Sequence, residues 1–346
     1  MKRIYLLGDK KLRWSLSQDL VHARRFFERL NCEIVTNIFS ADIIYSPCHT
    51  PLLRRKHYCI LRLLKMIKNT RVITVISNDV SQHQPVYLHR LKDITDSIIV
   101  PSKRLYHFFS EKSWNVTLTL MPFFIDKQCF TRKNESRFNI CDSLHIPHEM
   151  IRDRLLIGSF QRDSLGRDLK CPKWQKDPDL LVRIIQSFPR DDILLVLAGP
   201  RRHYLINQCR THDIPYLFYG DERYIDSGKD DLEVNNIDNA TISMLYNLID
   251  CYIVTSKSEG GPKAILEASM TKTFIVSTDV GLAPDILHRD LLYDGTDPEG
   301  LADLIMKVVK DDILTREYID YNYAMVNSAL DEDSLMEKYK SLVYRS

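Results

Sequence analysis

Two glutamates eight residues apart, Glu259 and Glu267, stand at the start of a predicted helix and could bind a hydroxyl-rich ligand. The apolar run Cys251–Thr255 predicts a buried strand before them, and the pattern over 262–271 predicts the helix. Glu259 falls in the loop between the two elements, where its carboxylate can accept hydrogen bonds from hydroxyls. Glu267 falls within the helix, and because a carboxylate accepts two parallel hydrogen bonds, it matches a vicinal diol such as a ribose.

The turn between the two glutamates predicts an anion site. Gly261 suits the cap of the helix, and Pro262 suits its first position. Three backbone N–H groups would then be unpaired at the start of the helix, those of Lys263, Ala264 and Ile265. Together with the helix dipole and the charge of Lys263, these groups favour a bound phosphate.

The rest of the chain supplies the elements that must hold this segment in place. Short β-branched apolar runs alternate with amphipathic stretches, and the runs lack a period of two, which favours parallel strands buried on both faces. In the first half the predicted strands are Arg3–Leu7, Glu33–Thr36, Ile43–Tyr45, Val72–Ile76, Ser97–Val100 and Thr117–Met121. In the second half they are Leu155–Gly158, Ile193–Ala198, Tyr216–Tyr219, Cys251–Thr255, Phe274–Ser277 and Leu291–Tyr293. Because helical patterns lie between the strands, the sequence predicts an α/β protein with parallel sheets and right-handed crossovers.

The length of 346 residues suits two domains of ordinary size. A polar stretch over 127–152 interrupts the rhythm, so we expect one Rossmann-like domain over residues 1–150 and a second over 151–325. The last helical pattern follows the completed second sheet, and residues 326–346 are expected to return to the first domain. Open α/β sheets bind ligands beyond the carboxyl ends of their strands, so we expect the site in a cleft between the domains.

Composition fits a globular protein, with 44% apolar and 27% charged residues. The first apolar run is too short for a signal peptide, and no stretch approaches the roughly 18 apolar residues of a membrane span. The eight cysteines include no C-x-x-C pair, which does not favour a metal or redox site. We therefore expect a reduced, cytoplasmic protein, peripheral to the inner face of the membrane if it binds lipid, without metal or other cofactor.

Charge is distributed unevenly along the chain. Residues 1–150 hold 24 basic and 13 acidic residues, a net charge of +11, whereas the remainder holds 24 and 33, a net charge of −9. This asymmetry suggests that the N-terminal half meets nucleic acid, anionic lipid or a phosphate-bearing acceptor, the alternative being two differently charged solvated surfaces. We expect no nucleic acid, because the basic residues lack the interleaved aromatic pattern of RNA-binding modules.

The stretch Leu52–Arg71, which includes the helical pattern Leu52–Lys68, carries much of this positive charge. Basic residues stand at Arg54, Arg55, Lys56, Arg62, Lys65, Lys68 and Arg71. Apolar residues stand between them, at Leu52, Leu53, Ile60, Leu61, Leu63, Leu64 and Ile67. A basic amphipathic helix can lie on an anionic bilayer, but the same pattern fits a helix that covers a sheet and has a basic outer face. The sequence leaves both interpretations open.

Glu-x7-Glu after a strand, with a Gly-Gly-Pro turn and the ending Leu-Glu-Ala, resembles the motif of the family-4 retaining glycosyltransferases of the GT-B fold. Other segments resemble the same family. Leu156–Arg162 resembles its first C-domain strand and the arginine after it, and Lys176–Leu181 resembles a Lys-Gly-x-Asp-x-Leu helix start with Asp177 in place of the glycine. Tyr219-Gly220 resembles the strand end that faces the base, and Met121–Asp126 resembles the segment that closes the first domain. The resemblance covers residues 117–310 most clearly.

This resemblance implies a GT-B fold, in which two Rossmann-like domains with parallel sheets face each other across a cleft. It also implies transfer of a sugar from a nucleotide-sugar donor with retention of anomeric configuration, and no metal. Arg162 and Lys176, with Lys173 as a rival cation, would hold the donor diphosphate and stabilise it as it leaves. Glu259 would contact hydroxyls of the transferred sugar. The residues implied in donor binding are Glu267, Gly260, Gly261, Pro262, Lys263, Ala264, Ile265 and Gly220.

The N-terminal half departs from the family pattern. Gly8 is alone where many members have a glycine-rich loop, and Asn78 and Asp79 stand where many have a histidine. Asn78, Asp79 and Trp14 are therefore acceptor-side candidates, and the expected acceptor is a glycan, a lipid-linked sugar or a surface polysaccharide. Two other functions remain open, a nucleotide-sugar epimerase or hydrolase of the same fold and a non-catalytic protein that binds an anion or nucleic acid.

Overall fold

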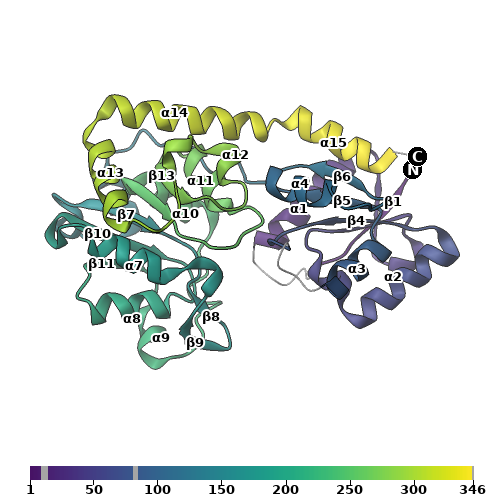
Figure 1. The fold of residues 1–346 in the computed structure, drawn as a ribbon, viewed down its shortest axis with the longest axis horizontal. Helices are drawn as coiled ribbons and strands as arrows, with labels where there is room; N and C mark the ends of the chain where they lie inside the picture. Colours follow the sequence, from purple (N-terminus) through teal and green to yellow (C-terminus); the bar gives the residue numbers. More distant parts are fainter. Residues whose placement is uncertain (9–14, 81–84, 345–346) are drawn as a thin grey trace. The chain divides into compact units, whose positions relative to one another are not determined.

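Two six-stranded parallel sheets organise the chain (Figure 1). A computed structural model describes residues 1–8, 15–80 and 85–344, with the backbone alone at 15–17 and 85. The first sheet has the order β2-β1-β3-β4-β5-β6, formed by β1 (Arg3–Leu6), β2 (Glu33–Val35), β3 (Ile43–Ser46), β4 (Arg71–Val75), β5 (Ser97–Val100) and β6 (Thr117–Leu120). The second has the order β11-β10-β7-β12-β13-β14, formed by β7 (Leu155–Ser159), β10 (Ile193–Ala198), β11 (Tyr216–Tyr219), β12 (Cys251–Val254), β13 (Phe274–Thr278) and β14 (Leu292–Tyr293).

The predicted α/β class and the predicted strands are confirmed. Every residue of β10 is buried, as are all residues of β3, β5 and β12, so these strands have covered faces on both sides. This double burial explains why their sequences show no alternation of apolar and polar residues. On β7, Gly158 is needed for packing, because a Cβ there would lie 2.3 Å from the side chain of Ile249.

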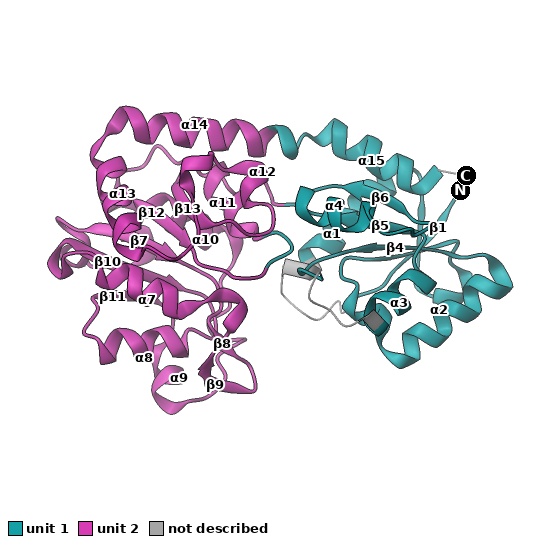
Figure 2. Ribbon diagram, in the orientation of Figure 1, with its two compact units in different colours: residues 1–124, 259–261, 328–346 teal, residues 125–258, 262–327 magenta. Residues whose placement is uncertain are grey.

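The chain divides into two compact units (Figure 2). The first comprises Met1–Phe124, Glu259–Gly261 and Ser328–Ser346, and the second comprises Ile125–Ser258 and Pro262–Asn327. Helices of the first unit are α1 (Ser15–Arg29), α2 (Arg55–Lys68), α3 (Pro85–Ile94), α4 (Lys103–Ser110) and α15 (Glu332–Tyr344). Those of the second are α5 (Arg137–Leu144), α6 (His148–Ile151), α7 (Pro178–Gln186), α8 (His203–Thr211), α9 (Glu222–Ser227), α10 (Asn239–Leu248), α11 (Lys263–Met270), α12 (Ala283–Ile286) and α13 (Pro298–Lys310). Helix α14 (Asp312–Ala329) runs from the second unit into the first.

Residues 125–150, which the sequence placed in the first domain, pack in the second unit. Helix α5 contacts α10, and the backbone N–H of Lys133 donates to Asn247 Oδ1 over 2.8 Å. An ion pair joins Arg137 to Asp250. The polar composition of this segment suggested a connection, but it contains helices because Ser136 caps α5 by accepting from the N–H of Asn139.

Helix α15 belongs to the first unit and packs on α1. Tyr339 stacks on Phe26 with ring centroids 4.6 Å apart, and Glu332 pairs with Arg29. The guanidinium of Arg71 donates to the last carbonyls of α15. These contacts attach the end of the chain to the sheet formed by its beginning.

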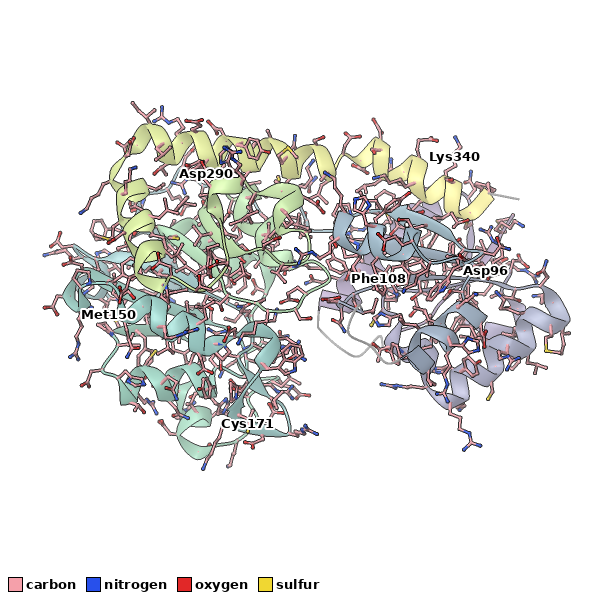
Figure 3. The ribbon with its side chains drawn as sticks, viewed as in Figure 1. Asp96, Phe108, Met150, Cys171, Asp290 and Lys340 are labelled. Atoms are coloured by element: carbon pink, nitrogen blue, oxygen red, sulfur yellow. The ribbon has the colours of Figure 1, made fainter. Side chains whose placement is uncertain are left out.

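A two-stranded antiparallel hairpin, β8 (Ser164–Leu165) and β9 (Asp168–Pro172), lies in a stretch where the sequence predicted no strand. Figure 3 labels Cys171 on this hairpin. The backbone N–H groups of Asp163 and Ser164 both donate to the carbonyl of Arg201, and the N–H of Lys173 donates to the carbonyl of Asp163. The hairpin is therefore anchored by residues distant in sequence, which local patterns do not reveal. In the described part of the chain, no helix has the length and apolar character needed to cross a membrane.

Candidate active site

The switch point of the second sheet lies beside its central strand, β7. From β7 the chain moves to β10 and β11 on one side, and then returns to β12 on the other side. Ligands of open α/β sheets bind outside the carboxyl ends of the strands at such a point. Arg162 follows β7, and the segment that leads to Glu267 follows β12, so the fold brings both loops to the place where a nucleotide is expected.

The loops after β7 and β12 are bound to each other. Thr255 Oγ1 donates to the carbonyl of Lys176 over 2.8 Å, and the N–H of Lys257 donates to the carbonyl of Gln175 over 2.9 Å. Lys257 Nζ also pairs with Asp177 Oδ2 at 2.8 Å. The short 3-10 helix Trp174–Lys176 that carries the candidate cation is therefore fixed against the end of β12.

Asp177 occupies a left-handed backbone conformation, with φ of 44° and ψ of 61°. Glycine adopts this region without steric cost, whereas Asp and Asn are the other residues that tolerate it. The glycine expected from the family resemblance is thus replaced by a residue that can still make the same turn. The conformation ends the 3-10 helix and starts α7, whose positive dipole end then lies next to Lys176 in the chain.

Arg162 lies partly buried next to a second guanidinium. Burial and the nearby charge of Arg201 both lower its pKa, and Asp230 opposes them. Arg201 pairs with Asp230 at 2.7 Å. Because Arg201 is already bonded to Asp230 through two hydrogen bonds, Arg162 is the one of the two guanidinium groups that we assign to a diphosphate.

The residue that follows Arg162, Asp163, forms a fully buried ion pair. Arg202 Nε is 3.1 Å from Asp163 Oδ2, and neither side chain is more than 2% exposed. Asp163 also accepts hydrogen bonds from the hydroxyl of Ser164 and the N–H of Leu205. Burial raises the pKa of Asp163 while Arg202 lowers it. The pair fixes the start of the hairpin and so fixes the backbone at Arg162.

Helix α11 begins one residue later than the sequence suggested. Pro262 is the N-cap, with φ of −65° and ψ of 116°, and Lys263 is the first helical residue. The N–H of Ile265 donates to the carbonyl of Pro262 over 3.1 Å, so the prediction that this group is unpaired is wrong. The anion site would therefore rest on the N–H groups of Lys263 and Ala264 and on the dipole of α11.

The carboxylate of Glu267 accepts a hydrogen bond from a buried tyrosine. The hydroxyl of Tyr246, a residue 1% exposed, donates to Glu267 Oε2 over 3.1 Å. Burial raises the pKa of Glu267, while Lys263 and the hydrogen bond from Tyr246 lower it. The ring of Tyr246 packs within 5.1 Å of the rings of Phe160 and Tyr252, measured between centroids, which fixes its orientation.

Sequence reasoning missed Tyr246, since it lies on α10 with no motif around it. No sequence pattern connects Tyr246 with Glu267, which lies 21 residues later, and only the fold brings the two side chains into contact. The hydrogen bond occupies one face of Oε2 and leaves the other carboxylate oxygen to accept from a ligand.

Gly220 follows β11 at a position that admits no side chain. A Cβ there would lie 2.5 Å from the ring of Phe218 and 2.9 Å from Asn235 Oδ1. Asn235 Oδ1 accepts from the N–H of Asp221 over 2.7 Å, so the amide cannot move away without losing that bond. The glycine therefore lets Phe218 and Asn235 pack closely against the end of β11.

The first unit contains the remaining candidates. A Cβ on Gly260 would lie 2.8 Å from the backbone C and O of Ser77 and 3.0 Å from the N of Asn78, so glycine is required there too. Glu259 is partly buried and Gly261 is buried. Asn78 is exposed and Asp79 is half-buried after β4. Trp14 lies outside the described residues.

Over the described residues, no three His, Cys, Asp or Glu side chains gather in a way that could hold a metal ion. Metal-independent transfer stays a prediction.

Comparisons with known proteins agree with this geometry. Residues 233–325 match the family model of glycosyl transferases group 1. The structure is similar to that of Anabaena HepE in complex with UDP and glucose, with 13% identity, a TM-score of 0.72 and 99% of each chain covered. It is also similar to sucrose-phosphate synthase from Thermosynechococcus elongatus, with 13% identity, a TM-score of 0.72, and 99% of this chain and 98% of that chain covered. A glycosyltransferase from Rickettsia africae matches with 14% identity, a TM-score of 0.63, and 98% of this chain and 84% of that chain covered.

No curated protein sequence matches the chain. The structural matches nevertheless identify the fold as GT-B, the fold that the motifs implied. The family match spans the part of the chain that holds Glu259 and helix α11, on which Glu267 lies. The chain therefore has a GT-B fold, and its segment 233–325 is similar to glycosyl transferases group 1.

Proposed function

We propose that this chain transfers a sugar from a nucleotide-sugar donor to a glycan, lipid-linked or surface-polysaccharide acceptor, with retention of anomeric configuration and without a metal. The observation that carries the proposal is the network of bonds that joins the Lys176 segment to the end of β12, whose following helix presents Glu267. A cation, a helix start and a carboxylate are thereby held at the switch point of one sheet. These are the groups that a diphosphate and a ribose need.

The roles of the site residues follow from the charge that the reaction places on the leaving group. Breaking the anomeric C–O bond places negative charge on the leaving nucleotide diphosphate, and fixed cations in a site that excludes water stabilise that charge strongly. We assign this role to Arg162 and Lys176, with Lys173 as the alternative cation. Glu267 accepts hydrogen bonds from the ribose, and Glu259 accepts them from hydroxyls of the sugar. The oxygen of the leaving phosphate would take the proton of the acceptor on the same face of the sugar, which gives retention without an enzyme nucleophile.

A uridine nucleotide is the first donor to test. The structure of HepE contains UDP in one complex and UDP-glucose in another. The likeness at 13% identity concerns the fold, so UDP enters here as a proposal.

The first test measures thermal stability with UDP, GDP, ADP and CMP and with their sugars. A nucleotide at 100 times its Kd stabilises the native state by about 2.7 kcal/mol. We expect a uridine nucleotide to give this shift in the wild type and in Glu299→Ala, which removes an exposed carboxylate elsewhere in the second unit. Glu267→Ala should lose the shift. An equal shift in Glu267→Ala would contradict the ribose assignment.

The second test follows the fate of the sugar. With a radiolabelled donor identified by the first test, we expect label to appear in a membrane or polysaccharide fraction, and NMR of the product to show the donor's anomeric configuration. Rapid release of free sugar without acceptor would instead favour a hydrolase or epimerase. Salt-sensitive binding of RNA together with no response to any nucleotide would favour a binding protein.

A further inference from the structure

Helix α2 of the first unit exposes apolar side chains on the face opposite its core contacts. Leu61 and Leu64 are buried against the sheet. In contrast, Leu63 is 48% exposed, Met66 81% and Ile67 76%. Together with exposed Cys59, these residues have the spacing i, i+4, i+7 and i+8, which places them on one outward stripe of the helix. An ordinary sheet-covering helix has charged and polar residues on this face.

Basic side chains flank the exposed stripe. Arg55, Lys56 and Arg62 are exposed, and none of them has an acidic partner among the described residues. By contrast, Lys65 pairs with Asp96, labelled in Figure 3, at 2.6 Å, and Lys68 approaches Asp42 at 3.9 Å. The lysines nearer the core are therefore neutralised within the unit, while the outer cations are not.

No acidic residue occurs anywhere between Asp42 and Asp79 in the sequence. The helix itself, with the sequence RKHYCILRLLKMIK, contains none. The helix thus presents basic and no acidic side chains of its own around the apolar stripe, and Asp93 of α3 bonds to it only at Tyr58 among the described residues. Such a surface repels a second copy of itself, because a symmetric contact would bring the same cations together. It also does not suit RNA, because leucine, methionine and isoleucine cannot stack on bases as aromatic rings do.

We propose that α2 docks the first unit on an anionic lipid bilayer. The helix lies in the plane of the headgroups, with Leu63, Met66 and Ile67 entering the boundary of the acyl chains. Arg55 and Arg62 then contact lipid phosphates along one edge of the stripe, and Lys56 contacts them at its N-terminal end. An interfacial helix needs this combination of an apolar stripe and a basic rim, and its binding is the sum of buried apolar area and attraction to anionic lipid.

This docking is independent of the proposed sugar transfer, so each can fail without the other. Exposed substitutions of this kind change folding stability little, and unfolding curves of each variant confirm that it is folded. The experiment is sedimentation of the full chain with vesicles of phosphatidylcholine, with and without phosphatidylglycerol, at low and high salt. We expect binding to the anionic vesicles alone, and weaker binding at high salt because exposed charges are screened.

Two variants separate the two contributions. Arg55→Gln/Lys56→Gln/Arg62→Gln should weaken partitioning into anionic vesicles by on the order of a hundredfold, since each basic side chain near the surface contributes independently. Leu63→Ser/Met66→Ser/Ile67→Ser should weaken it by at least about tenfold while keeping its salt dependence. The matched charge control is Lys307→Gln/Lys310→Gln/Arg316→Gln, three exposed cations of the second unit. The matched apolar control is Ile313→Ser, at a residue 82% exposed.

Retention of full binding by the two controls together with loss in both α2 variants supports the proposal. Equal binding to neutral and anionic vesicles, or no binding to either, overturns it. An equal loss in the control variants also overturns it, because charge or exposure anywhere on the protein would then suffice. A concentration-dependent dimer that Met66→Ser abolishes would assign the stripe to a second copy instead.

Discussion

Replacing Tyr246 by phenylalanine tests how Glu267 is held. The change removes one hydroxyl and keeps the ring, so the packing against Phe160 and Tyr252 remains. It deletes the 3.1 Å hydrogen bond to Glu267 Oε2. A hydrogen bond to a charged group contributes about 1.5–3 kcal/mol. Because Glu267 is only partly buried and water can replace part of the bond, we expect a loss of about 1–2 kcal/mol in the free energy of unfolding.

The same variant should change how nucleotide binding depends on pH. Burial raises the pKa of Glu267, and Tyr246 opposes that shift by donating to the ionised form. Without the hydroxyl, the pKa rises further. The ionised carboxylate is the form that accepts two ribose hydrogen bonds, so affinity for nucleotide falls as pH falls through this pKa. In Tyr246→Phe the fall should begin at a higher pH than in the wild type.

The assay is titration of the stabilising nucleotide across the acid range, with unfolding by urea alongside. Tyr293→Phe is the matched control, since it removes a hydroxyl that donates to the carbonyl of Val254 and leaves Glu267 untouched. We expect the control to lose stability without moving the pH midpoint of binding. The reasoning about Tyr246 is refuted if its variant and the control show the same midpoint, even when both lose stability.

Three further predictions concern the segments around the site. Asp177→Ala should lower the free energy of unfolding, measured with urea, by about 1–2 kcal/mol, and Asp177→Gly should lower it by less. Both variants lose the ion pair with Lys257, but only alanine puts a Cβ in the left-handed region. Lys176→Ala should reduce kcat by on the order of 10²–10³-fold in steady-state assays while affinity for the nucleoside stays the same. Arg202→Met should cost about 3–5 kcal/mol at neutral pH, because it leaves Asp163 buried and ionised, and unfolding curves at lower pH should show a smaller cost as Asp163 takes up a proton.

The strands could be predicted because a strand that is buried on both faces has a mostly apolar sequence. A strand such as β10 is apolar at every position, and its short length favours a buried strand over a helix. The segment from β12 to α11 was located equally well, since Pro262 and the two glycines mark the turn. The exact start of the helix was not, because a turn residue and a first helical residue look alike in sequence.

The hairpin β8–β9 and Tyr246 could not be predicted. The hairpin depends on the carbonyl of Arg201, which lies on a different loop of the second sheet. Tyr246 contributes through a contact that exists only once α10 lies beside α11. Helix α2 shows a third limit, since its sequence fits both a covering helix and a membrane helix. The exposure of Met66 and Ile67, on which the proposed docking rests, is a property of the fold and not of the sequence pattern.

The glycines of the second sheet and its loops show which departures from a family pattern a site can accept. Where a Cβ would strike a neighbour, as at Gly220 and Gly260, glycine is present. At position 177 the backbone is left-handed, and aspartate replaces glycine at a modest steric cost while gaining a pair with Lys257. This substitution thus preserves the backbone turn that starts α7 next to Lys176, and it does not argue against a working donor site.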